Sequence, residues 1–150
     1  RLSDKQYSHG IELLKLAAVL QYTFFGFPCV YYGDEVGVEG YKDPFCRGCY
    51  PWGKENKLLL DFYRRLGQLR NNSVFADGDF RQLVAERGVY AFRRALPTTQ
   101  TEVVVAVNCG TSEYKLSLNG RYTDMLNGRS YDNECNLQPM DYVVLQKDLF

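Results

Sequence analysis

The hydrophobic periodicity of this 150-residue chain changes from helical to alternating near its middle. In the first half, apolar residues recur at the three- and four-residue spacing of helices, which predicts helices over Ile11–Gln21 and Lys57–Arg70, the second with Asn56 as its N-cap. In the second half, short runs alternate between apolar and polar residues, as half-buried strands do. Helices followed by strands indicate an α+β arrangement, so we expect two parts, residues 1–72 and residues 73–150.

Six short strands are expected in the second part, with turn residues between them. Asn119-Gly120 and Asn127-Gly128 each stand between alternating runs, and this dipeptide is a strong hairpin signal. The expected architecture is an antiparallel β-sandwich packed on the helices. The strands are expected near Phe80–Ala85, Val89–Ala95, Glu102–Val107, Tyr114–Leu118, Tyr122–Met125 and Tyr142–Gln146.

Between the two helices, the stretch from Gly26 to Trp52 is typical of a buried strand that runs into a long polar and aromatic loop. The strand is expected at Cys29–Tyr32, because Gly26 and Pro28 end the preceding helix. Barrel and open-sheet enzymes hold their ligands at such strand ends. About two dozen residues precede this strand, which is too few for the rest of a parallel sheet. We therefore expect a part of a larger enzyme.

Composition and charge disfavour several classes of partner. Lys plus Arg and Asp plus Glu number 18 each, so the formal charge is zero and nucleic acid is not expected to bind. No apolar run approaches the ~18 residues that span a bilayer, and the first residues do not resemble a signal peptide, so no membrane partner is expected. The five cysteines cannot all pair with one another, which favours reduced thiols and a cytoplasmic location.

Cys46 and Cys49 form a Cys-x-x-Cys motif, which raises the question of metal or redox chemistry. A zinc site needs more soft ligands, but His9 is the only histidine and the other cysteines lie on separate expected elements. Thioredoxin chemistry places the motif at the start of a helix, whereas here Tyr50-Pro51 follows it in a loop. We expect free thiols here, and neither a metal nor a cofactor.

The segment from Gly26 to Gly40 resembles the last barrel strand of the alpha-amylase family of glycoside hydrolases. The family pattern is Gly-x-Pro-x-x-Tyr-Tyr-Gly-Asp-Glu-x-Gly, and the chain matches each defined position. Downstream, the stretch from Asp43 to Trp52 is similar to the cyclomaltodextrinase, neopullulanase and maltogenic amylase branch. The resemblance covers nearly the whole chain and is strongest over residues 10–71.

This resemblance implies that residues 1–72 are the last strand-helix segment of a (β/α)8 barrel and that residues 73–150 are the family's C-terminal domain. It implies a retaining hydrolase that acts on cyclodextrins, pullulan or maltooligosaccharides, at alpha-1,4 linkages first and with alpha-1,6 linkages as the alternative. The family's nucleophile, acid/base and third carboxylate would lie upstream of Arg1, so we expect no catalytic residue here and no activity of this chain alone. The alternative is a non-catalytic, amylase-like sugar-binding or scaffold module.

Asp43, Arg47 and Trp52 are the candidates for substrate binding. A carboxylate accepts hydrogen bonds from sugar hydroxyls while a guanidinium donates them in a fixed fork, so Asp43 and Arg47 can clamp one glucose unit. The resemblance implies that they hold the sugar toward the non-reducing end of the cleft. The alternatives are an ion pair that only shapes the loop and a Trp52 that pins the loop to the barrel.

Asp34 and Glu35 are expected to be structural residues of the rim. Neighbouring residues on a strand point to opposite faces, so these two carboxylates cannot flank one glycosidic bond as a catalytic pair does. A buried carboxylate needs a charged or donor partner, and a salt bridge is the default expectation for Glu35.

An isolated barrel strand has consequences for association. Without neighbouring strands, its backbone groups and the buried faces of two helices are left exposed. We therefore expect this chain to self-associate, in addition to binding the upstream barrel residues and an alpha-glucan oligosaccharide.

Overall fold

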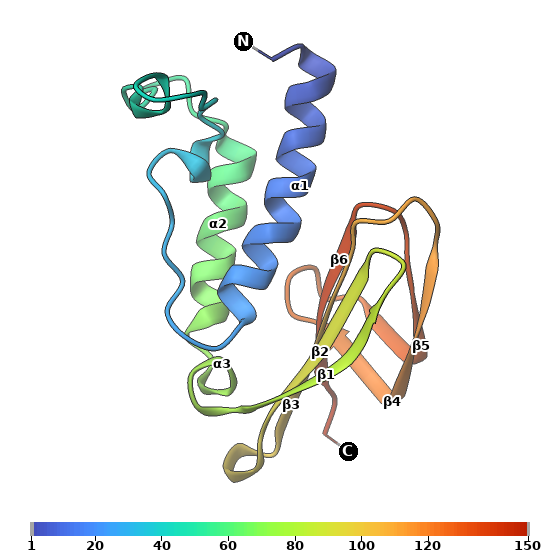
Figure 1. Ribbon diagram of the computed structural model, residues 1–150. Helices are drawn as coiled ribbons and strands as arrows, with labels where there is room; N and C mark the ends of the chain where they lie inside the picture. The colour runs from blue at the N-terminus through green and yellow to red at the C-terminus, as the bar shows by residue number, and fades with distance from the viewer. Residues whose placement is uncertain (1, 150) are drawn as a thin grey trace.

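A computed structural model describes residues 2–149, with three α-helices followed by one antiparallel sheet (Figure 1). The two long helices lie side by side, and the sheet packs beside them. The helices are α1 (Asp4–Thr23), α2 (Lys57–Arg70) and α3 (Ser73–Asp77), and the 3-10 turns are η1 (Asp34–Val36), η2 (Phe45–Arg47) and η3 (Pro97–Thr99). The strands are β1 (Asp79–Glu86), β2 (Val89–Leu96), β3 (Thr101–Asn108), β4 (Tyr114–Asp124), β5 (Ser130–Leu137) and β6 (Asp141–Lys147).

Side-chain caps set the starts of both long helices. The Asn56 side chain accepts a hydrogen bond from the Leu59 amide at 3.1 Å, which confirms the expected N-cap of α2. Helix α1 begins earlier than its apolar repeat indicates, because Ser3 and Gln6 form a capping box that satisfies the free amides of the first turn. Within residues 2–149, no helix is long and apolar enough to cross a membrane.

The strands form one six-stranded sheet in the order β1-β2-β3-β6-β4-β5, with every neighbouring pair antiparallel. The expected antiparallel β domain is present, but its strands form one hydrogen-bonded sheet and not the separate sheets of a usual sandwich. The reason is the length of β4, which pairs with β5 and whose end, Tyr122 to Asp124, also pairs with β6. This second pairing joins strands β4 and β5 to strands β1, β2, β3 and β6 in one continuous sheet.

Two features of the second half depart from the sequence-based expectation. Asn119-Gly120 is not a turn, because Gly120 (φ 107°) lies inside β4 where the register with β5 shifts, as at a bulge. The expected strands on either side of it are thus one strand. Strand β5 was not expected from the sequence, because its middle, from Asp132 to Glu134, is polar and exposed. Asn127-Gly128 does form the turn between β4 and β5.

The expected strand Cys29–Tyr32 is absent. These residues belong to no ladder, and the Cys29 carbonyl accepts a hydrogen bond from the side chain of Gln21 at 2.6 Å. A strand exists only when a neighbour pairs with its backbone, and residues 2–149 supply no such neighbour at this place. The apolar composition of the segment therefore does not suffice to make it a strand.

The two faces of the sheet bury different cores. On β3, Val103, Val105 and Val107 face the helices and pack with α1, α2 and α3, whereas Val104 and Ala106 face the opposite core. This alternation explains why the buried run of β3 is continuously apolar, since both of its faces are covered. The second core lies between β2, β3 and β6 and the side chains of β4 and β5, including the buried Cys135.

Arg94 of β2 connects the helices to the sheet. Its side chain is 1% exposed and donates hydrogen bonds to four backbone carbonyls at 2.9–3.1 Å. Burial lowers the pKa of the Arg94 guanidinium, and the nearby Arg70 charge lowers it further. The four carbonyls belong to Thr23 at the end of α1, Phe75 and Gly78 around α3, and Asp79 at the start of β1.

Arg70, in the last turn of α2, holds the chain that leaves α1. Its guanidinium donates to the carbonyls of Tyr22, Phe24 and Gly26. The carboxyl end of a helix presents carbonyls without intrahelical donors, and a cation there is favoured by the helix dipole. Arg70 and Arg94 therefore fix the point at which the long loop region begins.

We expect Arg94→Met to destabilise the chain by about 3 kcal/mol or more, because several buried carbonyls lose their donor at once. Urea unfolding followed by circular dichroism measures the loss. Arg121→Met is the control, since Arg121 makes an exposed ion pair with Asp148 at 3.3 Å and its loss should cost about 1 kcal/mol or less. Equal losses in the two variants would contradict the central role of Arg94.

Candidate functional site

The candidate site is the long connection between α1 and α2, and its first part is a tight turn. Gly33 (φ 87°) and Gly37 (φ 72°) bracket the 3-10 turn η1, and the Val38 amide donates back to the Gly33 carbonyl at 2.9 Å. Both glycines have the left-handed conformation that residues with a Cβ rarely adopt. Val36, between them, is buried and anchors the turn in the protein.

Tyr7 of α1 fixes this turn from outside. Its hydroxyl donates to the Gly37 carbonyl at 3.2 Å, and a Cβ placed on Gly37 would lie 2.3 Å from the same hydroxyl oxygen. At the other end of the loop, the Asn56 amide donates to the Val36 carbonyl at 3.3 Å. The loop of residues 37–55 thus leaves and re-enters the fold at one place.

Asp43 and Arg47 meet on this loop. Arg47 Nε lies 3.0 Å from Asp43 Oδ1, and the two side chains are 65% (Asp43) and 71% (Arg47) exposed. The 3-10 turn η2 brings them together across the Asp43-Pro44 peptide, which is cis. The structure therefore joins two of the residues singled out for substrate binding, with both functional groups open to solvent.

Tyr32 supports the part of the loop that carries Arg47. Its hydroxyl donates to the Gly48 carbonyl at 2.9 Å, and it also lies 3.5 Å from the Cys46 carbonyl. The Cys46 thiol in turn contacts Asp43 Oδ1 at 3.6 Å. A phenol and a thiol thus help to hold the backbone under the Asp43–Arg47 pair.

Trp52 projects from the loop. Its side chain is 82% exposed, and its ring centroid lies 4.5 Å from that of the half-buried Tyr50 at an angle of 50°. This tilted aromatic pair offers flat apolar surface with a polar tip, a combination that suits the face and hydroxyls of a sugar.

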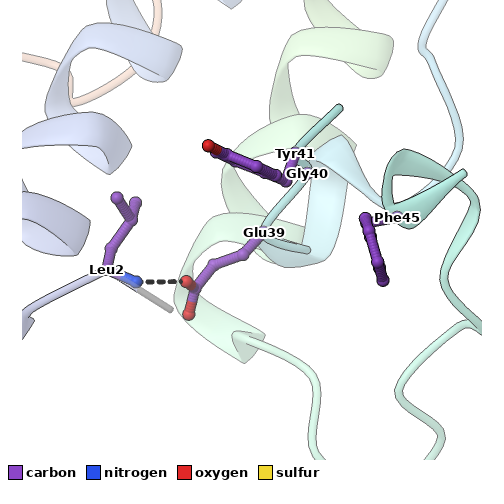
Figure 2. A pocket seen from close by; sticks show the side chains of 5 residues that line it. All are labelled: Leu2, Glu39, Gly40, Tyr41 and Phe45. Atoms are coloured by element: carbon purple, nitrogen blue, oxygen red, sulfur yellow. Dashed lines mark hydrogen bonds between the residues drawn. The ribbon is translucent and has the colours of Figure 1, made fainter. Parts of the chain in front are cut away.

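A cavity of about 440 Å³ lies between the start of α1 and the loop (Figure 2). Tyr41 and Phe45 line it with largely exposed rings. Glu39 also lines it, and its carboxylate accepts a hydrogen bond from the Leu2 amide at 2.7 Å. The cavity therefore combines aromatic surface with one acidic group, next to the Asp43–Arg47 turn.

Asp34 and Glu35 differ from the expectation in their backbone, because they lie in the 3-10 turn η1 and not on a strand. Burial raises the pKa of the Asp34 carboxyl, and the neighbouring Glu35 charge raises it further. Within residues 2–149 the Oε2 atom of Glu35 is buried without a hydrogen-bond partner, so the salt bridge expected for Glu35 stays a prediction.

None of the five cysteines forms a disulfide in the described structure. Cys46 and Cys49 lie on the loop, whereas burial raises the pKa of the Cys135 thiol to about 11. In the described part of the chain, no group of three or more His, Cys, Asp or Glu side chains is placed to hold a metal ion.

Sequence reasoning missed the residues that shape this region from a distance. Tyr7 precedes Gly37 by 30 positions, so no local spacing connects the two. Tyr41 and Phe45 each lie two positions from Asp43 in the sequence. Their aromatic character was the signal that could have identified them as candidates for sugar contact. Glu39 faces Leu2 only because the loop returns to the start of α1.

The chain is similar to proteins named amylopullulanase and cyclomaltodextrinase, although no family model matches it. The amylopullulanase of Thermoanaerobacterium saccharolyticum is 34% identical over 148 residues, which is 86% of this chain and 12% of the relative. The cyclomaltodextrinase of Thermoanaerobacter pseudethanolicus is 39% identical over 112 residues, which is 73% of this chain and 19% of the relative.

Solved structures agree with these relatives. The alpha-amylase of Anoxybacillus matches with a TM-score of 0.81 and 25% identity, over 93% of this chain and 33% of that one. This chain matches a C-terminal part of alpha-amylase family enzymes. A debranching enzyme of Nostoc punctiforme matches with a TM-score of 0.72 and 29% identity, over 90% of this chain and 31% of that one. The 150-residue chain spans less than a fifth of the length of the amylopullulanase and of the cyclomaltodextrinase named above.

We expect Gly37→Ala to disturb the loop, because its Cβ would collide with the Tyr7 hydroxyl and its φ would be strained. Hydrogen exchange of the amides in residues 37–55 should become faster, and the unfolding midpoint should fall. Gly67→Ala is the control, since Gly67 lies in α2 with open space around it. That change should stabilise the chain by up to about 1 kcal/mol. Unchanged exchange in Gly37→Ala would contradict the role of this contact.

Proposed function

We propose that this chain is the C-terminal part of a retaining alpha-glucan hydrolase. Residues 1–72 would supply the last strand-helix segment of its (β/α)8 barrel, and residues 73–150 its C-terminal domain. The substrates we propose are cyclodextrins, pullulan or maltooligosaccharides with alpha-1,4 or alpha-1,6 linkages. The names of the relatives, amylopullulanase and cyclomaltodextrinase, support this choice.

The main observation behind the proposal is the exposed Asp43–Arg47 ion pair, which lies on a loop held by the hydrogen bond from the Tyr32 hydroxyl to the Gly48 carbonyl. In the proposed complex, the Asp43 carboxylate accepts hydrogen bonds from sugar hydroxyls, and Arg47 donates to hydroxyl oxygens from a fixed plane. Their mutual contact at 3.0 Å keeps both groups oriented before the sugar arrives. Trp52 would add apolar contact with a sugar ring.

The proposed chemistry needs groups that we place outside these residues. A retaining glycosidase uses two carboxyl groups about 5 Å apart, one as nucleophile and one as acid/base. We assign neither role to Asp34 or Glu35, which follow one another in the small turn η1. The 150-residue chain by itself is therefore expected to bind sugar at most and not to hydrolyse it.

The test uses the polypeptide that carries the proposed upstream barrel, with maltotriose and beta-cyclodextrin as substrates. We expect Asp43→Ala to lower kcat/KM about 10- to 100-fold, the loss of one or two charge-assisted hydrogen bonds. Asp61→Ala is the matched control, because Asp61 pairs with Arg64 at 3.1 Å in an equally exposed ion pair away from the loop, and its kcat/KM should not change.

Two results would contradict the proposal. One is an Asp43→Ala variant that keeps the kcat/KM of the Asp61→Ala control. The other is turnover of maltotriose by the purified 150-residue chain. If the longer polypeptide is inactive, but the chain binds maltose and loses this binding in Asp43→Ala and Trp52→Ala, the alternative of a non-catalytic sugar-binding module replaces the hydrolase.

We also propose that the 150-residue chain associates with itself through the loop region. Phe25 (67% exposed), Phe27 (100% exposed) and Tyr31 (57% exposed) follow one another along a segment that has no strand partner in residues 2–149. Such apolar surface favours association. Light scattering should report a dimer or a larger assembly, and Phe27→Ser should shift it toward monomer without loss of fold. A monodisperse monomer would contradict this expectation.

A further inference from the structure

The carboxylate of Glu35 is an unusual group in this fold. Its Oε2 is buried and has no hydrogen-bond partner in the described chain. Taking a carboxylate out of water without a partner is costly, so proteins normally pair such a group with a cation or with several donors. The only other buried side-chain atom without a hydrogen bond in residues 2–149, Arg93 Nε, still has Glu102 within 3.7 Å.

The surroundings of Glu35 do not neutralise it. Asp34 adjoins it in the chain, and Tyr22 and Tyr63 lie close enough for its charge to raise the pKa of their hydroxyls, although burial is the larger cause. The pKa of Tyr63 is raised to about 12. The groups near this carboxylate are thus acidic or neutral, with one exception.

The exception is Arg64, which lines the same cavity as Glu35. Arg64 Nη1 is bound to Asp61 Oδ1 at 3.1 Å on the exposed side of α2, so this cation is engaged elsewhere. Arg64 nevertheless gives an alternative partner, and the experiment has to separate it from a partner outside these residues.

The cavity beside Glu35 measures about 320 Å³ and is open on one side. Its other walls include Tyr22, Val30, Leu60 and Tyr63. Val30 belongs to the segment that has strand-like composition but no strand partner among residues 2–149. An acidic side chain in the wall of an open cavity that aromatic and aliphatic side chains also line, next to a segment without a strand partner, fits a long side chain with an apolar stem and a cationic end.

We propose that Glu35 pairs with a lysine or arginine side chain from the part of the full-length protein that packs against residues 24–36. This inference rests on the proposed function, since it needs the upstream barrel. The length of the relatives is in keeping with such a partner, because this chain corresponds to 12% of the amylopullulanase and 19% of the cyclomaltodextrinase. The ion pair would hold the end of residues 24–36 against that part of the full-length protein.

The test compares one substitution in two contexts. Glu35→Gln is made in the 150-residue chain and in the polypeptide that carries the preceding residues, and Tm is measured at low protein concentration. In the short chain the variant removes a charge whose Oε2 atom is buried without a hydrogen-bond partner, so Tm should rise by about 2–4 °C. In the longer polypeptide it breaks an ion pair and leaves a buried cation, so Tm should fall by a similar or larger amount.

Arg64→Ala in the short chain is the second variant. We expect it to leave Tm nearly unchanged, as for other exposed ion pairs. A fall of Tm in both Glu35→Gln and Arg64→Ala in the short chain would overturn the proposal, because Arg64 would then be the partner. A rise of Tm in Glu35→Gln in both contexts would also overturn it, because no partner would exist.

Failure of the Glu35 ion pair and failure of the proposed function would give different experimental results. Intact mass and sequencing of the longer polypeptide, together with glucan hydrolysis, report on the upstream barrel and its carboxylates. The sign of the Tm change reports only on Glu35. An active hydrolase whose Tm rises in Glu35→Gln would leave the proposed function standing and reject the ion pair.

Discussion

The hydrogen bonds of Arg94 are the contact on which the rest of the structure depends. One guanidinium on β2 binds carbonyls at the end of α1, around α3 and at the start of β1. These carbonyls come from places where regular structure ends, so the helices and the sheet leave them without partners. An arginine has enough donors for all of them, and its burial is tolerated because each donor group is used.

The same arrangement determines where the candidate site begins. Arg70 holds the carbonyls of Tyr22, Phe24 and Gly26, and Arg94 holds that of Thr23, so the chain leaves α1 in a fixed direction. From there the turn at η1, held by Tyr7, sends the loop outward. The exposed Asp43–Arg47 pair is thus supported by contacts that lie far from it in sequence.

The region around residues 24–36 carries the marks of an incomplete interface. Four of its aromatic side chains, Phe25, Phe27, Tyr31 and Tyr32, are exposed, its backbone pairs with no strand of the described chain, and one buried carboxylate oxygen lacks a partner. The upstream neighbour that we propose would account for all of these features. By contrast, most apolar side chains of α2 and of the sheet are buried in two cores within these residues.

The sequence by itself determined the two long helices, most strands and the local motifs, because caps, periodicity and turn residues act over a few positions; it did not predict the short helix α3. Asn56, the alternation of β3 and the Asp43–Arg47 spacing belong to this class. Tertiary structure alone decided that Gly120 makes a bulge, that β4 joins the two halves of one sheet, and that Cys29–Tyr32 is not a strand. Those outcomes depend on pairing partners distant in the chain, whose presence no local pattern encodes.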